Sequence, residues 1–252
     1  MRSPKHRIWV AGVLLLILPA PSSAAEGECN GFDDLSRDAE ISLGSISKPR
    51  VQFIKTSLDD EACPSTTAAC RQSAYLVRGD EVILSRSRNG FVCAAFLAPR
   101  RRMVLGWLPA DAVARRRGDR AFQVEDWVGD WQFDLRAPRY RAQGFTITKS
   151  ASKPGMLHIE GNANYADDQA AARKGSVNTA NIAGEVAPTG AVLEFDDGDE
   201  DNPVPKERAG DGGSCHIQMR LLGRYLLAKD DWQCGGQNVT FWGIYQRKSA
   251  RR

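Results

Sequence analysis

Six cysteines constrain the fold of this 252-residue chain more than any other feature of its sequence. All of them follow an N-terminal stretch with a basic start, an apolar run from Ile8 to Leu18 and small residues ending at Ala25. These three parts in this order are typical of a secretory signal peptide, and the apolar run is shorter than the roughly 20 residues that span a bilayer. We therefore expect export, removal of residues 1–25 and no transmembrane anchor in the mature chain.

An even number of cysteines in an exported chain indicates disulfide bonds formed in an oxidising compartment. The segment from Cys215 to Cys234 has the pattern of a strand, a turn, a second strand and a loop. A disulfide between its ends would close this hairpin and contribute about 3 kcal/mol through loop entropy. Gly235 and Gly236 are then expected to supply positive φ for the turn into the last strand. The predicted disulfides are Cys63–Cys70, Cys215–Cys234 and, by elimination, Cys29–Cys93.

Charge is balanced in the mature chain but is unevenly distributed along it. The full chain has 34 Lys and Arg against 31 Asp and Glu, and the signal peptide carries three of the basic residues and no acidic one. The net positive charge is therefore removed with the signal peptide, and we expect no nucleic acid as a partner. Residues 26–62 hold 4 basic and 9 acidic residues, whereas residues 63–124 hold 11 and 4. The basic segment either forms a solvated face or favours an anionic surface such as phospholipid, lipopolysaccharide or cell-wall polymer.

Short apolar runs separated by Gly and Pro predict a mostly β protein, because no long stretch has the period of a helix. Between residues 74 and 113 these runs include an Asn89-Gly90 pair, which is a strong hairpin signal. The stretch YLVRGDEVILS resembles the opening of an SH3-type barrel, and GWLPADAV resembles its closing segment. The resemblance covers residues 65–117 and, in an exported chain, favours the bacterial SH3 (SH3b) variety.

The SH3 resemblance implies a ligand groove with aromatic walls. Ala112 stands where a Tyr is usual, and Phe91 stands where a Trp is usual, so we do not expect recognition of a Pro-rich peptide. SH3b domains are associated with cell-wall peptides, which implies peptidoglycan or an envelope protein as the partner. The candidate binding residues of this unit are Tyr75, Phe91, Trp107 and Pro109.

Eight strand-like runs with hairpin-like spacing, the first at 127–133 and the last at 238–246, fill residues 125–248 and suit an up-and-down barrel. The motif Gly129-Asp130-Trp131 resembles the Gly-x-Trp signature of lipocalins. In that family a basic residue near the last strand packs over the Trp, and Arg247 is the match here. Periplasmic protease inhibitors of Gram-negative bacteria, small disulfide-stapled barrels opened by Gly-x-Trp, are also similar. Trp131 and Arg247 are therefore the candidate residues of the second unit.

The chain offers little for catalysis or metal binding. Only His158 and His216 remain in the mature chain, each in a strand-like run, and a nucleophile needs a base within reach. The acidic stretch at 194–214 resembles a calcium loop but lacks its sixth-position Gly and twelfth-position Glu. This stretch is a solvated loop, a weak calcium site or a partner-binding loop. We predict no enzyme activity, no catalytic residues, no metal site and no cofactor.

The predicted fold class is all-β, with a small SH3-like barrel followed by an eight-stranded, lipocalin-like antiparallel barrel. The predicted segments are the signal peptide (1–25), an acidic N-terminal segment that packs on the first barrel (26–64), the SH3b-like domain (65–117), a linker (118–124), the lipocalin-like barrel (125–248) and a basic tail (249–252).

From these parts we expect an exported, non-enzymatic binding protein of the cell envelope, in the periplasm or outside the cell. The first barrel would engage wall or envelope components, and the second would bind a small apolar ligand or a protein. The alternatives are a periplasmic inhibitor of a secreted hydrolase and a structural or assembly protein. A closed cavity of roughly several hundred Å³ in the second barrel would favour a ligand, whereas a filled barrel would favour inhibition or interaction.

Overall fold

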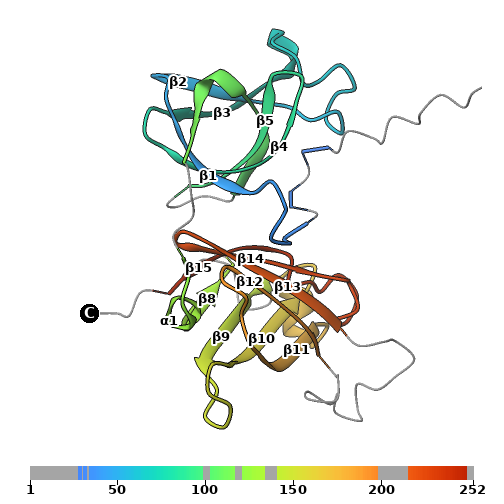
Figure 1. Cartoon of the computed structure of the whole chain (residues 1–252). Coiled ribbons are helices and arrows are strands. Elements are labelled where there is room, and N and C mark those ends of the chain that lie inside the picture. Colours follow the sequence, from blue (N-terminus) through green and yellow to red (C-terminus); the bar gives the residue numbers. More distant parts are fainter. Residues whose placement is uncertain are drawn as a thin grey trace, which may run out of the picture.

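The computed structural model describes residues 28–29, 31–32, 34–98, 103–116, 121–133, 141–197 and 215–248. These residues form two antiparallel sheets, each curled around a core of its own and lying one above the other (Figure 1). The mostly-β prediction is therefore confirmed. The predicted signal peptide, the basic tail and residues 198–214 of the acidic loop lie outside the described part of the chain. Where the chain is described, none of its helices is long and apolar enough to cross a membrane.

The first sheet is a partial barrel of seven strands in the order β3-β2-β6-β5-β4-β1-β7. The Asn-Gly prediction is confirmed, because β4 and β5 form a hairpin in which Asn89 and Gly90 have φ values of 48° and 81°. The strands are β1 (Ser42–Ile46), β2 (Arg50–Ile54), β3 (Arg71–Val77), β4 (Glu81–Arg88), β5 (Phe91–Leu97), β6 (Met103–Pro109) and β7 (Val113–Arg115), with 3-10 turns at Ala68–Cys70 and Ala110–Ala112.

The acidic N-terminal segment contributes β1 and β2 to the sheet itself. Strand β1 was not predicted, since its sequence SLGSI lacks a clear alternation of apolar and polar residues. It lies between β4 and β7, and Gly44 permits this close packing. A Cβ at Gly44 would approach Leu84 Cδ1 to 2.6 Å and the carbonyl oxygen of Ala114 to 3.2 Å.

The second sheet is a nearly closed barrel of eight antiparallel strands, as predicted. Consecutive strands pair in up-and-down order, and β15 returns to pair with β8. Strands β11 and β12 border the opening, where the Ala183 amide donates to the Asp197 carboxylate at 3.4 Å. The strands are β8 (Gly129–Gln132), β9 (Gln143–Lys149), β10 (Leu157–Tyr165), β11 (Asn178–Val186), β12 (Val192–Asp197), β13 (Cys215–Leu222), β14 (Tyr225–Asp230) and β15 (Gly243–Arg247); the helices are α1 (Val124–Trp127) and α2 (Gln169–Arg173).

The predicted bounds of the first and last barrel strands were wrong. The predicted strand 127–133 begins only at Gly129, because α1 precedes it and the Gln123 amide donates to the Asp126 carboxylate at 2.8 Å. The predicted strand 238–246 begins only at Gly243. Residues 231–242 instead form a loop over one end of the barrel, which we call the cap loop.

The interior of the second barrel is filled by aromatic side chains. The ring of Phe145 lies 5.3 Å from that of Phe241 and 4.8 Å from that of Tyr245, and Phe133 lies 5.9 Å from Tyr245. Trp127 is fully buried and donates its indole N–H to the Gly190 carbonyl at 3.2 Å. The barrel is therefore a packed core, which matches the interior of other small eight-stranded barrels.

The outer faces of β13, β14 and β15 are also buried, because they pack against the first sheet. The outward side chains on these strands are apolar: Leu222, Tyr225, Leu227 and Ile244. Their neighbours come from the first sheet and from the segment before it: Phe32, Leu35, Ile41, Leu43, Ile83 and Ala95. Burial on both faces explains why the run YLLA at 225–228 does not alternate as a half-exposed strand does.

Arg220 fastens the segment before β1 to the second barrel. The residue is 7% exposed, and its guanidinium donates to the carbonyls of Ser36, Ala39 and Ile41 at 2.5, 3.2 and 3.4 Å. A buried charge is tolerated when such hydrogen bonds replace water. The two sheets thus share a hydrophobic core, and the buried guanidinium of Arg220 lies at its edge.

Candidate functional site

The three predicted disulfides are all present. Cys29 joins Cys93, Cys63 joins Cys70, and Cys215 joins Cys234, with Cα atoms 5.2, 5.6 and 4.7 Å apart. The sulfur atoms of the last pair lie near the Asp231 carboxylate, but a disulfide has no thiolate to offer a metal ion. Disulfides of this number are compatible with an exported protein.

The candidate residues of the first barrel do not form an exposed aromatic groove. Trp107 is fully buried, because β6 lies inside the sheet and its indole packs with the Cys29–Cys93 disulfide. Phe91 is 8% exposed and pairs with Pro109 across β5 and β6. Only Tyr75 presents its ring, half-exposed on the edge strand β3, with the guanidinium carbon of Arg50 3.8 Å from the ring centre.

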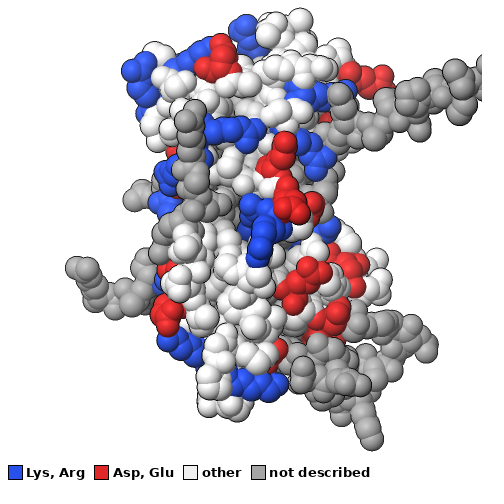
Figure 2. All heavy atoms as spheres, viewed as in Figure 1, with Lys and Arg blue, Asp and Glu red and all other residues white. Residues whose placement is uncertain are grey.

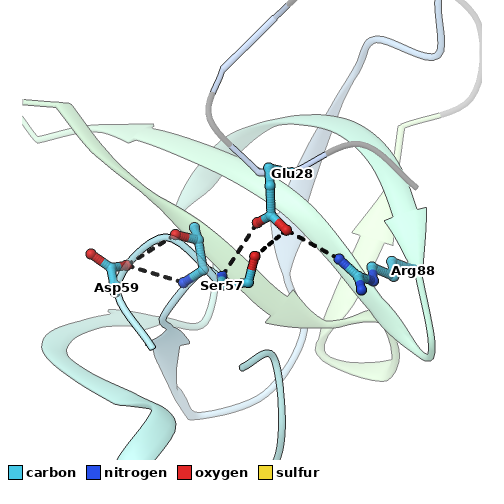
Figure 3. A network of polar contacts seen from close by, with 5 residues as sticks. Glu28, Ser57, Asp59 and Arg88 are labelled. Carbon is cyan, nitrogen blue, oxygen red and sulfur yellow. Dashed lines mark hydrogen bonds and ion pairs between the residues drawn. The ribbon is translucent and has the colours of Figure 1, made fainter. Parts of the chain in front are cut away.

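A polar network holds the start of the described chain against the first barrel (Figure 3). The Glu28 carboxylate accepts hydrogen bonds from the Ser57 amide at 3.3 Å, from the Ser57 hydroxyl and from Arg88 at 3.2 Å. The Asp59 carboxylate accepts from the amide and the hydroxyl of Thr56 at 3.1 and 3.2 Å. Because Glu28 precedes Cys29, this network and the disulfide position the same short segment.

Basic residues of the first barrel are interspersed with acidic ones. Arg88 pairs with Glu28, and Arg116 pairs with Glu81 at 2.7 Å. In the view of Figure 2, blue and red side chains alternate over both barrels without one continuous basic face.

The Gly-x-Trp motif and Arg247 meet at the α1 end of the second barrel. The guanidinium carbon of Arg247 lies 4.7 Å from the Trp131 ring centre, and the Trp131 indole N–H donates to the Trp127 carbonyl at 2.9 Å. Gly129 has a φ of +146°, and a Cβ there would lie 3.1–3.4 Å from the Arg247 side chain. Trp131 is 2% exposed, so this cluster closes the barrel end rather than facing a ligand.

The two histidines in the described part of the chain lie on the outer surface of the second barrel. His216 contacts Asp196 through Nδ1 at 2.8 Å and Glu194 through Nε2 at 2.9 Å. His158 lies 3.3 Å from Glu160 on the same strand. Each ring therefore interacts with neighbouring carboxylates, as expected for side chains on a solvated strand face.

The opposite end of the barrel holds a shallow pocket of about 160 Å³. Its size is well below the roughly 300–1,000 Å³ of pockets that enclose a whole small ligand. Its floor includes Gln143, whose side-chain oxygen accepts from the buried Tyr245 hydroxyl at 3.1 Å. The pocket is lined by Phe133, Arg141, Gln143, Ala163, Asn164, Tyr165, Asn238, Val239 and Thr240.

A second hollow of about 250 Å³ lies on the surface beside α1. It is lined by Gln123, Val124, Glu125, Lys149, Ser150, Pro154, Gly155 and Met156. Lys149 and Glu125 pair across it at 2.5 Å, and both side chains are more than half exposed. A solvated ion pair of this kind contributes little to stability or recognition.

The cap loop is organised by one buried carboxylate, that of Asp230. Asp230 is 3% exposed and accepts hydrogen bonds from the Thr240 hydroxyl and the Phe241 amide, both at 2.7 Å. The backbone N–H of Trp232 also bonds to it. Burial raises the pKa of Asp230 above its usual 3.8, and these hydrogen bonds oppose the rise.

The cap loop is tied to two neighbouring strands. The Cys215–Cys234 disulfide joins it to β13. On the β11 side, the Gly236 amide donates to the Thr179 carbonyl at 3.3 Å, and the Asn178 amide side chain donates to the Gln237 carbonyl at 2.7 Å.

The predicted role of Gly235 and Gly236 was wrong, because neither has a φ in the left-handed region. They permit close approach instead. A Cβ at Gly235 would lie 2.5 Å from the Ala180 Cβ and 3.0 Å from the Thr179 carbonyl oxygen.

The cap loop presents Trp232 to solvent. Its side chain is 66% exposed, and its φ of +66° is unusual for a bulky residue. The bond from its backbone N–H to Asp230 and the nearby disulfide hold this conformation. Sequence reasoning missed this residue, because nothing in the string DDWQCGG distinguishes an exposed Trp from a core one.

Comparison with known proteins gives no match to a family model, to a curated protein or to a solved structure. The SH3b and lipocalin resemblances therefore stay predictions from sequence.

Proposed function

We propose that this chain is an exported, non-enzymatic binding protein of the cell envelope that recognises its partner through the cap loop. The single observation that carries the proposal is Trp232, exposed and held on a braced loop above a filled barrel. Tryptophan is among the residues that anchor binding interfaces, since one ring contributes a large contact area. A loop already fixed by a carboxylate and a disulfide loses little entropy when it binds.

The place of action follows from the signal pattern and the disulfides. The N-terminal pattern directs export, and six paired cysteines suit an oxidising compartment such as the periplasm or the exterior. The first barrel would then engage the wall or another envelope component, with Tyr75 as its exposed ring. The shared core would hold the two barrels together on that component.

Inhibition of a secreted hydrolase is the second candidate function. It is favoured by the same loop, because a disulfide-closed segment with one projecting side chain suits insertion into an enzyme cleft. The acidic stretch at 194–214 is the other candidate element for this role, and residues 198–214 of it lie outside the described part of the chain.

Capture of envelope components tests the proposed function. The purified, disulfide-bonded protein would be cross-linked in an envelope extract and compared with Trp232→Ala and with Leu58→Ala. Leu58 is a matched control, since it is 75% exposed but lies on the first barrel. We expect the Trp232 variant to lose about tenfold in captured partner and the Leu58 variant to match the parent. Equal capture by all three proteins would contradict the proposal.

Binding to purified peptidoglycan tests the role of the first barrel. We expect the protein to sediment with insoluble peptidoglycan and Tyr75→Ala to sediment less, with a known wall-binding protein as the positive control. Absence of the parent protein from the pellet would remove the wall as its partner. A panel of secreted hydrolases assayed with and without the protein distinguishes inhibition from binding alone.

A further inference from the structure

The cap loop itself is almost uncharged. In residues 231–242 only Asp231 carries a charge, in a chain of which 26% of residues are charged. The exposed residues on the loop and on the start of β11 are mainly amides and small residues: Asn178, Thr179, Asn181, Gln233, Gly235, Gly236, Gln237 and Asn238. Two hydrogen bonds place the start of β11 beside the loop, from the Asn178 side chain to the Gln237 carbonyl and from the Gly236 amide to the Thr179 carbonyl.

The ring-sized pocket opens on the same loop. Asn238, Val239 and Thr240 form one side of it, and Phe133 and Tyr165 contribute aromatic walls. A cavity of roughly 150 Å³ holds one benzene-sized ring, so a pocket of about 160 Å³ admits a single six-membered ring.

Asp230 anchors both the backbone of Trp232 and one side of the pocket. Its carboxylate accepts hydrogen bonds from the Trp232 backbone and from the Thr240 hydroxyl, so the start and the end of the loop are bonded to the same group. The surface therefore offers two places for rings, one flat and exposed and one recessed.

We propose that this surface binds a neutral glycan, with Trp232 stacked on one sugar ring and the pocket holding another. This inference rests on the proposed binding function and names its substrate class. A sugar ring has apolar C–H faces, which suit an aromatic ring, and hydroxyls that both donate and accept. Amide side chains match these hydroxyls because they also donate and accept.

Charge separates this ligand class from its rivals. Arg141 is the charged residue of the pocket lining, and its guanidinium already donates to the carbonyls of Ala166 and Asp167. Asp231 lies beside Trp232 and disfavours an anionic polymer. A protein interface commonly has an apolar centre around its anchor, whereas the exposed residues that flank Trp232 along the cap loop are Asp231, amides and glycines.

The inference is tested with an array of neutral oligosaccharides of increasing length. The array includes cello-, malto- and chito-oligosaccharides, with tetragalacturonate as the charged comparison, and hits are titrated by calorimetry. We expect at least one neutral series to bind, with affinity rising from one ring to several. Trp232→Ala should weaken binding by at least about tenfold, the typical effect of losing an aromatic anchor. Leu58→Ala, which truncates an exposed apolar side chain on the first barrel, should leave the affinity unchanged.

A second variant addresses the pocket. Tyr165→Ala should weaken binding of longer oligosaccharides more than binding of a single ring, because it removes one wall of the recessed position. Tyr165 also packs against the barrel core, so circular dichroism of the variant is compared with that of the parent.

Three results would overturn the glycan inference: no neutral oligosaccharide bound, binding unchanged by Trp232→Ala, or preference for tetragalacturonate. If the glycans fail while Trp232-dependent capture of an envelope protein persists, the proposed binding function stands and its partner is a protein. If both fail, the cap loop is a structural cover of the barrel and both proposals are wrong.

Discussion

Asp230 shows how one side chain can determine the shape of a loop. The residue follows a predicted strand, and its sequence neighbourhood is that of an ordinary polar turn. In the folded chain it is buried with three donors around it. The cap loop exists in its observed form because those donors would otherwise be unsatisfied inside the protein.

Replacing Asp230 tests this role. Asp230→Ala leaves the Thr240 hydroxyl and the Phe241 amide without their acceptor, so we expect a loss of about 1–3 kcal/mol in the free energy of unfolding. Asp231→Ala, at the exposed neighbouring position, should change it by less than about 0.5 kcal/mol. Urea denaturation of both variants measures the difference. Equal losses would show that the buried carboxylate does not organise the loop.

The raised pKa of Asp230 predicts the sign of a pH effect. Between the unfolded value near 3.8 and the higher folded value, the folded state binds more protons, so this group makes stability fall as pH rises. Other carboxyls, such as those of Glu125 and Glu185, have lowered pKa values and act oppositely. The difference in unfolding free energy between the parent and Asp230→Asn isolates the effect. We expect the parent to lose stability relative to the variant as pH rises through this window.

The paired glycines allow a second test at the residue scale. Gly235→Ala forces a methyl against the Ala180 Cβ and the Thr179 backbone, so we expect a loss of about 1–3 kcal/mol. Gly236→Ala is the matched control, because its Cβ would meet only the Asn178 side chain, at 3.1–3.4 Å. Thermal unfolding of the two variants should rank Gly235→Ala as the less stable. If Gly236→Ala were the less stable variant, close approach to β11 would not be what requires glycine at position 235.

At the scale of elements, the Cys215–Cys234 disulfide joins β13 to the cap loop across a separation of 19 residues. Changing both cysteines to Ser should cost about 3 kcal/mol, because the unfolded chain regains the entropy of the closed loop. Changing Cys63 and Cys70 should cost slightly less, since their separation is 7 residues. Chemical denaturation measures both costs. If the Cys215/Cys234 double variant kept the unfolding free energy and the partner binding of the parent, Asp230 alone would hold the cap loop in place.

At the scale of the whole molecule, the two barrels are joined by a shared core and by Arg220. We expect the parent protein to unfold in one calorimetric transition. Leu227→Lys introduces a charge into the shared core and should separate the transition into two, since an unpaired buried charge is costly. Leu58→Lys, at an exposed position of the first barrel, is the control and should retain one transition. Two transitions in the parent would show that the barrels are energetically independent.

The sequence by itself determined the β class, the eight-strand pattern and all three disulfide pairs. These features depend on local information: the period of apolar residues, the glycine turns and an even cysteine count in a chain whose N-terminal pattern predicts export. It also indicated the contact between Arg247 and Trp131, through a motif carried on two identifiable strands.

Only the tertiary structure decided which aromatic side chains are exposed. Trp107 lies within a strand-like segment and Trp232 follows one, yet the first is fully buried against a disulfide and the second is 66% exposed. Their difference depends on distant neighbours: β2 and β5 enclose β6, whereas Asp230 turns the Trp232 backbone outward. Packing of the two barrels on each other is similarly non-local, because it requires outward side chains of β13–β15 to meet β1 and β4.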